Sequence, residues 1–205
     1  MKHSIKTYLV PSFAALAITL SSCADAQSET ASSQTVSPST ATNWGIQAEN
    51  SYIRFTAKQE GEPFSGLFSE FSGIIRFDPD TPKTGMVDIT IPLSSVDAGS
   101  KDRNSTLPSK VWFSAKKFPD ARFTSDNISK KGDNYLAKGV LTLKGVSVPL
   151  DLPFTLQIDG DNAVMTGKAA LDRTLWGVGA APWDTDEWVS RRVELDVQVT
   201  ARRDL

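Results

Sequence analysis

The sequence predicts an all-β protein, and three observations support this prediction. From residue 44 to residue 205, segments with apolar residues at every second position follow one another, which is the period of a half-buried strand. Short polar turns that contain Gly, Asp or Pro separate these segments. One weak apolar pattern of helical period stands out, at residues 99–110, and it is long enough for only one or two turns.

The strands can be followed in chain order. "SYIRFTAKQ" (51–59) alternates Ile53, Phe55 and Ala57 with polar residues, and "FSGIIRF" (71–77) and "MVDITIPL" (86–93) repeat the pattern. Further strands are expected at "ARFTSDNI", "DNYLAKGVLTLKG", "VSVPLDLPFTLQID", "NAVMTGKAALDR" and "RRVELDVQVTA". The total is about eight. An up-and-down barrel pairs every edge without long crossovers, so we prefer an eight-stranded antiparallel barrel with one short helix to a sandwich.

Side-chain size decides whether such a barrel is packed solid or hollow, because eight strands enclose a volume that side chains can just fill. The expected inner rows mix large and small residues, namely Phe55, Phe71, Phe77 and Phe123 with Ala57, Gly73, Ala137, Gly139, Gly167 and Ala169. The small residues are expected to leave space. Taken alone, these rows still favour ordinary core packing over a ligand cavity.

The N-terminal segment has the features of an export signal. Two lysines precede an apolar run from Tyr8 to Leu20 that is too short to span a bilayer comfortably. Two cleavage sites compete here. "LSSC" resembles a bacterial lipobox, which would lipidate Cys23, whereas cleavage after Ala26 would release a soluble periplasmic protein. We favour the lipobox, because the only cysteine of an exported chain has no disulfide partner.

These features divide the chain into three parts. Residues 1–22 are predicted to be a lipoprotein signal peptide, residues 23–43 a lipidated cysteine and flexible tether, and residues 44–205 the barrel domain. The tether is rich in Ser and Thr and has one sizeable apolar side chain, Val36, so it cannot bury enough surface to fold. Ala24 after the cysteine, by resemblance to lipoprotein sorting, implies the outer membrane. We expect a periplasmic protein anchored there through Cys23.

Composition excludes several classes of function. The only histidine is His3, within the signal peptide, so the mature chain lacks the residues for Ser-His-Asp or Cys-His catalysis, imidazole or thiolate zinc sites and c-type haem attachment. Loss of residues 1–23 leaves 20 basic against 24 acidic residues, and no basic run is longer than two residues, as at the terminal Arg202-Arg203. Nucleic acid is therefore not an expected partner.

Carboxylate chemistry, lysine chemistry and plain binding remain as options. The pairs Asp78/Asp80 and Asp159/Asp161 stand beside Pro or Gly, where Asp is a common turn residue, and neither has the spacing of a calcium loop. In "WDTDEWV" (183–189), three acids lie between two tryptophans, and a solvated loop is favoured over a glycosidase pair. We therefore predict no enzyme, no catalytic residue and no metal site.

Several motifs together resemble the YceI-like family over nearly all of residues 44–203. They are Trp44-Gly45-Ile46, "FSGLFSEFSGIIRFDP" at 64–79, Asp102-Arg103 ahead of Trp112-Phe113, "KFPDARFTS" at 117–125 and "GVLTLKGVSVPLDLPFTL" at 139–156. The resemblance implies an exported, lipocalin-like barrel whose apolar cavity holds a polyisoprenoid or an isoprenoid quinone without catalysis. The resemblance therefore favours a ligand cavity over the ordinary core packing that the inner rows alone suggest.

The first strand departs from the family pattern. Members commonly carry H-S-x-I-x-F-x-x-x-H, whereas here Asn50 and Gln59 occupy the two histidine positions. With "KQEGEPFSGLF" (58–68), the chain is similar to members found beside membrane b-type cytochromes. The resemblance therefore implies that Lys58, Gln59 or Arg103 places a ligand head group in this chain.

The predicted ligand-binding residues fall into an apolar and a polar group. They are Phe55, Phe64, Phe68, Phe71, Trp112, Phe113 and Trp176 for the apolar walls, and Lys58, Gln59 and Arg103 for the polar contacts. A head-group contact and a surface ion pair are equally supported for Arg103. For each aromatic residue, core packing is at least as well supported as ligand contact. For Trp183 and Trp188, packing over the barrel rim is favoured over closing an end or docking a partner.

These observations predict a lipid-anchored binding protein for an isoprenoid-like amphiphile, with a carrier or storage role and no covalent cofactor. Its partners would be this long-chain amphiphile and the membrane that holds its anchor. The alternative is an accessory or scaffold protein that docks on a membrane b-type cytochrome, which requires an exposed aromatic patch. A carboxylate-dependent hydrolase would need two carboxylates facing one cleft, and the sequence offers no clear pair.

Overall fold

Closure of one antiparallel sheet between its first and last strands gives the domain its architecture. The computed structural model describes residues 41–204. The predicted signal peptide, Cys23, Ala26 and the tether up to residue 40 lie outside the described residues. The strands are β1 (Asn43–Ile46), β2 (Tyr52–Gln59), β3 (Glu62–Phe68), β4 (Ser72–Arg76), β5 (Met86–Pro92), β6 (Val96–Asp97), β7 (Asp120–Lys131), β8 (Asn134–Leu143), β9 (Val146–Asp159), β10 (Asn162–Asp172) and β11 (Arg192–Arg203).

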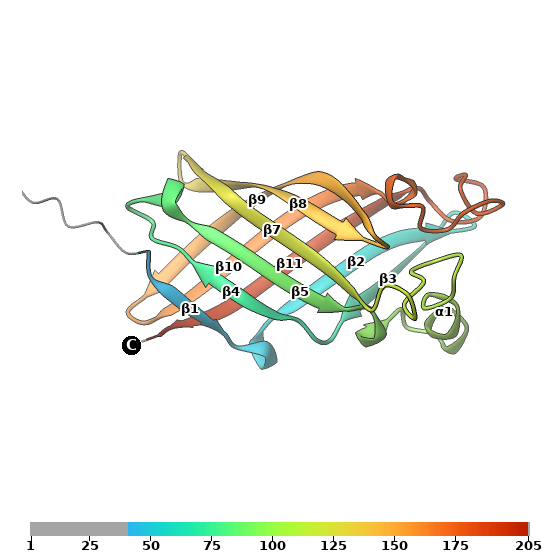
Figure 1. The fold of residues 1–205 in the computed structure, drawn as a ribbon, viewed down its shortest axis with the longest axis horizontal. Coiled ribbons are helices and arrows are strands. Elements are labelled where there is room, and N and C mark those ends of the chain that lie inside the picture. The colour runs from blue at the N-terminus through green and yellow to red at the C-terminus, as the bar shows by residue number, and fades with distance from the viewer. Residues whose placement is uncertain (1–40, 205) are drawn as a thin grey trace, which may run out of the picture. The chain divides into compact units, whose positions relative to one another are not determined.

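These segments form eight barrel strands, because three of the strands are each interrupted once. Both β1 and β2 pair with β11. On their other side, β1 pairs with β4 and β2 pairs with β3. The next strand is formed by β5, which pairs with β4, and β6, which pairs with β3. From β7 to β11, each strand pairs with the next in the sequence. Figure 1 shows the strands winding side by side around a common axis. The predicted eight-stranded antiparallel barrel with one short helix is confirmed.

A single serine bridges the break between β1 and β2, where the short 3-10 helix η1 (Ala48–Asn50) interrupts the strand. The Ser51 hydroxyl donates to the Gln47 carbonyl at 2.7 Å and accepts from the Thr200 amide at 2.9 Å. The side chain therefore replaces ladder hydrogen bonds that the interruption would otherwise leave unmade. Two further 3-10 turns, η2 (Pro82–Thr84) and η3 (Leu93–Ser95), flank β5.

The glycines of the inner rows do not leave the space that the sequence suggested. A Cβ at Gly139 would lie 2.4 Å from the ring of Phe123, and one at Gly73 would lie 2.0 Å from the Asp88 carbonyl oxygen. At Gly167 the neighbouring Leu152 side chain would be 3.0 Å away. The space that a side chain would take at each glycine is thus occupied by a neighbouring ring, backbone or leucine. The expectation of free space at these three glycines was wrong, since a close neighbour takes the room that each one leaves.

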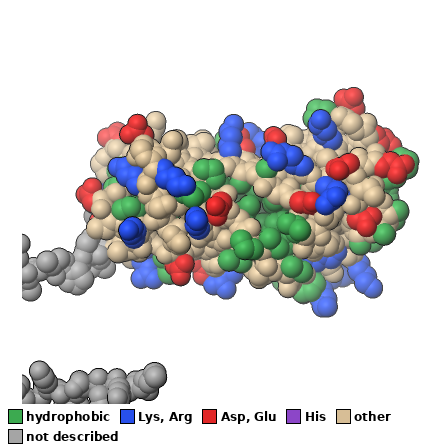
Figure 2. All heavy atoms as spheres, turned by 90° about the horizontal axis from the view of Figure 1, so that it is seen from above, with side chains coloured by type: hydrophobic (Ala, Val, Ile, Leu, Met, Phe, Trp, Pro, Cys, Tyr) green, Lys and Arg blue, Asp and Glu red, His purple; other side chains and the backbone are tan. Residues whose placement is uncertain are grey.

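One end of the barrel is covered and the other carries β1. The helix α1 (Lys101–Thr106), the 3-10 turn η4 (Arg173–Trp176) and the segment that follows η4 lie together at the right-hand end of Figure 1. The Ser100 hydroxyl accepts from the Arg103 amide at 3.2 Å and so caps the start of α1. The outer surface in Figure 2 carries scattered charges of both signs around an apolar patch, with acidic and apolar side chains together at the right-hand tip.

Trp176 fixes η4 against the barrel wall. Its side chain is only 2% exposed, and its indole Nε1 donates to the Leu141 carbonyl oxygen of β8 at 3.0 Å. Leu175, its neighbour, is 56% exposed. Adjacent positions on the same turn therefore have opposite environments, one inside the packed wall and one in solvent.

We predict that Trp176→Ala lowers the free energy of unfolding by about 3–5 kcal/mol, because it leaves a cavity and an unpaired carbonyl. Leu175→Ala is the matched control and should change stability by less than about 0.5 kcal/mol, as expected of an exposed position. Urea unfolding of the full chain measures both. A similar loss for the two variants would contradict the packing role of Trp176.

Candidate ligand-binding cavities

The interior of the barrel contains two apolar cavities. The first has a volume of about 150 Å³ and is lined, within residues 41–204, only by apolar side chains, among them Trp44, Phe71 and Phe154. The second has a volume of about 130 Å³ and includes residues near α1 and η4, such as Leu107 and Val178. Together they offer a ligand an apolar interior rather than a polar active-site cleft.

Four side chains line both cavities and therefore stand between them: Ile53, Ile91, Leu141 and Leu195. We call these four the waist residues. They come from β2, β5, β8 and β11, so they approach the barrel axis from several sides. The two cavities are therefore neighbouring compartments of one interior, separated by four aliphatic side chains.

The inward row of β9 shows why this interior is hollow. From Ser147 to Gln157 the side chains alternate between exposed and half-buried, and no member of the row is fully buried. The half-buried members Leu150, Leu152, Phe154 and Leu156 all line the first cavity. Their remaining accessible surface faces the cavity, because their exposed neighbours point outward. A solidly packed core would have buried this row completely.

Aromatic rings build the wall of the second cavity next to α1. Phe55 contacts Phe64 edge to face, with ring centroids 6.3 Å apart, and Phe68 at 5.8 Å. Phe68 in turn contacts Phe113 of the segment after α1 at 6.1 Å. Phe64 and Phe68 are half-buried, so this wall is shared between the cavity and the surface. The α1 end therefore offers a ligand an apolar route inward.

Arg103 lies on the rim of this wall. Its guanidinium carbon stands 4.7 Å above the Phe64 ring, its Nε donates to the Ala98 carbonyl at 2.8 Å, and its Nη1 donates to Gln59 Oε1 at 3.3 Å. The nearby Asp97 accepts hydrogen bonds from the side chain of Asn104 and from the Gly99 amide, and not from Arg103. These hydrogen bonds hold the pKa of the Asp97 carboxyl below its usual value. The structure thus brings together Gln59, Phe64 and Arg103.

Arg173 organises the part of the rim that is formed by the segment after η4. It is only 4% exposed and, among the described residues, is the one charged side chain that lines either of these two cavities. Its guanidinium donates to six backbone carbonyl oxygens, those of Val178, Gly179, Trp183, Thr185, Val189 and Ser190. Burial lowers the pKa of this guanidinium from its usual value. The segment from residue 177 to residue 191 is therefore folded around one buried cation.

Three tryptophans connect this segment to the cavity. Trp188 contacts Trp183, with ring centroids 6.5 Å apart, and Trp183 contacts Trp112 at 6.3 Å. Trp112 lines the second cavity and also lies under Arg173, whose guanidinium carbon is 5.3 Å from the ring centroid. Trp183 and Trp188 are 38% and 43% exposed, so they pack over the rim while presenting aromatic surface to solvent.

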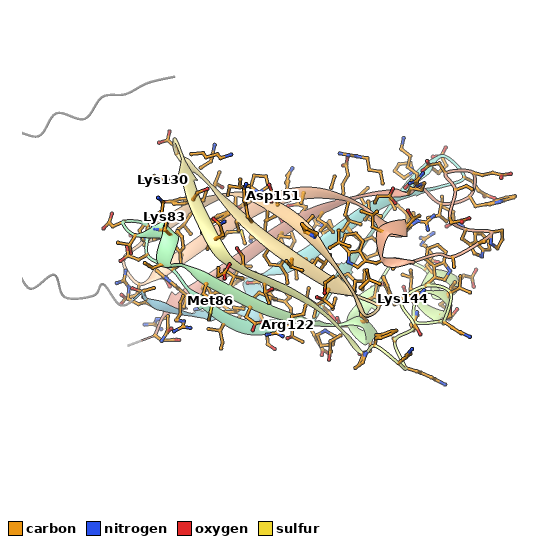
Figure 3. All side chains as sticks on the ribbon, turned by 45° about the horizontal axis from the view of Figure 1, so that its top comes forward. Lys83, Met86, Arg122, Lys130, Lys144 and Asp151 are labelled. Carbon is orange, nitrogen blue, oxygen red and sulfur yellow. The ribbon has the colours of Figure 1, made fainter. Side chains whose placement is uncertain are left out.

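Lys144 ties the two covering segments together at this end. Its Nζ donates to the Val111 carbonyl at 3.0 Å and to the Gly177 carbonyl at 2.5 Å. Partial burial lowers the pKa of this ammonium group. Figure 3 labels Lys144 toward the right-hand end of the barrel, away from Lys83 and Lys130. The cover over the second cavity is therefore held by hydrogen bonds from two cations to backbone oxygens.

The predicted site residues occupy three kinds of position. Phe55, Phe64, Phe68, Trp112 and Phe113 line the second cavity, and Phe71 lines the first. Gln59 and Arg103 meet on the rim, while Lys58 is exposed and its backbone pairs with Ser190. Trp176 lines neither cavity among the described residues and packs in the wall.

Sequence reasoning missed Arg173. It stands at the end of a predicted strand in "ALDRTLW", where a surface arginine would be expected. The only available signal was the long irregular segment that follows, whose buried carbonyls must find donors.

Residues 41–204 contain no cluster of three His, Cys, Asp or Glu side chains that could hold a metal ion. No helix within this range has the length and apolar character needed to cross a bilayer.

The sequence is similar to a known protein family and to several of its members. Residues 44–201 match the model of the YceI-like domain. A UPF0312 protein of Photorhabdus laumondii is 34% identical over 116 residues, which are 56% of this chain and 60% of that protein. Protein YceI of Salmonella arizonae is 33% identical over 117 residues, 57% of this chain and 61% of the relative. The chain thus spans about 60% of the length of the curated relatives it matches.

Two solved structures share the fold. BcnA of Burkholderia cenocepacia is 29% identical, with a TM-score of 0.73 over 76% of this chain and 98% of that one. A polyisoprenoid binding domain from Saccharophagus degradans, implicated in plant cell wall breakdown, is 17% identical, with a TM-score of 0.64 over 80% of this chain and 99% of that one. At 17% identity the likeness shows the fold alone.

We predict that Arg173→Met lowers the free energy of unfolding by about 3 kcal/mol or more, because several buried carbonyls lose their donor. Arg191→Met is the matched control. Arg191 is half-exposed and pairs with Asp172 at 2.7 Å, so its loss should cost at most about 1 kcal/mol. Urea unfolding measures stability, and limited proteolysis should show new cleavage between residues 177 and 191 in Arg173→Met only. Equal behaviour of the two variants would refute the organising role of Arg173.

Proposed function

The chain belongs to the YceI-like family, and on this premise we propose that it binds a long-chain, isoprenoid-like amphiphile inside the barrel. The observation that carries the proposal is the pair of apolar cavities that share four aliphatic side chains. A single long apolar chain fits such a volume better than a compact polar metabolite does. Every methylene transferred from water would contribute about 0.8 kcal/mol.

The chemical class of the ligand rests on two further points. The inner walls combine aromatic and branched aliphatic side chains, which suit the methyl branches and double bonds of isoprenoids. The domain from Saccharophagus degradans that shares this fold is a polyisoprenoid binding domain. We extend that class to this chain, with a polyisoprenoid or an isoprenoid quinone as the candidate ligand.

A carrier or storage role would follow from the location that the sequence suggests. A chain lipidated at Cys23 and tethered by residues 24–43 would hold the barrel close to the membrane that contains such amphiphiles, which raises their effective concentration. We therefore propose a periplasmic protein anchored to the outer membrane that takes up or stores its ligand. Cleavage after Ala26 would give the same barrel without the anchor.

The first test is to identify the bound molecule. We predict that the full chain, purified without harsh detergent from a bacterial host, carries one amphiphile per protein in native mass spectrometry. Organic extraction and mass analysis should then give an isoprenoid chain. An empty barrel, or a stoichiometric ligand without an isoprenoid chain, would contradict the proposal.

A substitution at the waist tests whether the two cavities act as one. We predict that Leu195→Phe leaves the binding of short-chain amphiphiles unchanged and weakens that of long ones, because methylenes beyond the waist lose their contribution of about 0.8 kcal/mol each. Isothermal titration with a series of chain lengths measures this. Glu194→Phe, which adds the same ring to the outer face of β11, is the control. A parallel loss for all chain lengths would show that the waist does not divide the interior.

Docking on a membrane b-type cytochrome is a second candidate, and the exposed pair Trp183 and Trp188 favours it. Indole rings at a surface can pack against a partner while their N–H groups remain hydrated. The full chain would then co-purify with a protein showing b-type haem absorption from mildly solubilised membranes. Substitution of both tryptophans by serine should abolish this absorption and leave amphiphile binding intact, and its persistence would reject the candidate.

A further inference from the structure

We propose that Arg103, Gln59 and Phe64 form a head-group subsite that selects amphiphiles with an anionic head group, a carboxylate or a phosphate, over neutral ones. The inference rests on the proposed binding of an amphiphile in the barrel and adds the chemistry of its polar end. Of the two candidate ligands, it favours a polyisoprenoid with an anionic end over a quinone, whose head group is neutral. It depends on the position of Arg103, on the absence of a carboxylate partner among the described residues, and on the cavity wall beneath it.

The Arg103 side chain is held in place by neutral groups. Its Nε donates to the backbone oxygen of Ala98 at 2.8 Å and its Nη1 to the amide oxygen of Gln59 at 3.3 Å. The guanidinium lies over the Phe64 ring at 4.7 Å, which orients its plane. A fixed guanidinium loses little conformational freedom when it binds an anion. Its orientation is therefore set before a ligand arrives.

No carboxylate among residues 41–204 forms an ion pair with Arg103. The ion pairs between described residues involve Arg54, Arg122, Arg191, Arg192 and Arg203, but not Arg103. Asp97, close by, receives hydrogen bonds from Asn104 and from the Gly99 amide instead. None of the described hydrogen bonds uses Nη2 of Arg103. One edge of the guanidinium therefore remains available to an oxygen anion.

The location beside the cavity wall connects this charge to the interior. Phe64, directly under the guanidinium, lines the second cavity, and its ring contacts Phe55 deeper in the same wall. A ligand whose head group meets Arg103 can lay its chain past Phe64 into the cavity. Carboxylates and phosphates match the planar donors of a guanidinium, whereas an alcohol offers only one neutral oxygen. The half-buried position of Arg103 limits screening by solvent without removing it.

The test compares head groups at a constant chain length. Dodecanoate, dodecyl phosphate, dodecanol and inorganic phosphate are titrated separately, below their micellar concentrations, into the full chain. We expect the two anionic amphiphiles to bind about tenfold more tightly than dodecanol, a factor of the size expected for one charge-assisted hydrogen bond. Inorganic phosphate should neither bind measurably nor displace dodecyl phosphate, since it has no chain to bury.

The variant Arg103→Gln should weaken both anionic amphiphiles about tenfold and change dodecanol binding by less than twofold. Retained dodecanol binding also shows that the variant is folded. Should Arg103→Gln fail to fold, Arg103→Lys takes its place, and it should lose more affinity for dodecanoate than for dodecyl phosphate because it cannot bind bidentately. Arg76→Gln is the control. Arg76 is exposed, lies on β4 and donates to the Met86 sulfur at 3.4 Å, so its loss should change none of the affinities.

Each other outcome rejects a defined part of the inference. Equal binding of all three amphiphiles, or an equal loss for all three in Arg103→Gln, would overturn the anionic subsite while leaving the apolar cavity intact. Displacement of dodecyl phosphate by inorganic phosphate would indicate a site for the free anion rather than for an amphiphile. Absence of binding by any of the three chains would instead overturn the proposed function itself, and with it the subsite.

Discussion

Closure of the sheet by pairing of β1 with β11 is the constraint on which the rest of the structure depends. Once the ring of backbone hydrogen bonds is complete, every strand has one face directed to the axis and one to solvent, and side-chain direction follows from position alone. The enclosed volume is then fixed by strand number, and the inward side chains either fill it or leave it partly empty. Here the inward row of β9 retains accessible surface, so the interior is hollow.

The two parts of the rim are held by different electrostatic means. Arg173 is buried and surrounded by backbone oxygens, so its charge is used to fold a segment. Arg103 lies on an aromatic ring with only two neutral acceptors, so part of its charge remains available. The difference follows from burial, since a buried guanidinium must satisfy all its donors within the protein whereas a rim guanidinium can leave one for a ligand or for water.

The strands and their closure could be predicted because period-two alternation directly reports which side chains face the axis. Ile53, Phe55 and Ala57 were assigned to the inner face from this pattern, and all three line a cavity. The interruptions at η1 and η3 could not be predicted, because they depend on how neighbouring strands meet around the closed barrel. The filling of Gly139 by Phe123 was missed for the same reason, since cross-strand neighbours follow from register and not from local sequence.

Folding of residues 177–191 around Arg173 has a consequence for variation of this surface. The contacts are made to backbone oxygens, which every amino acid possesses, and not to particular side chains. Substitutions at exposed positions such as Glu187 therefore leave the path of the segment unchanged. Arg173 thus fixes the backbone of this segment, while the side chains on its outer face can vary in sequence. The side chains exposed at this end can change without any change in how the chain folds.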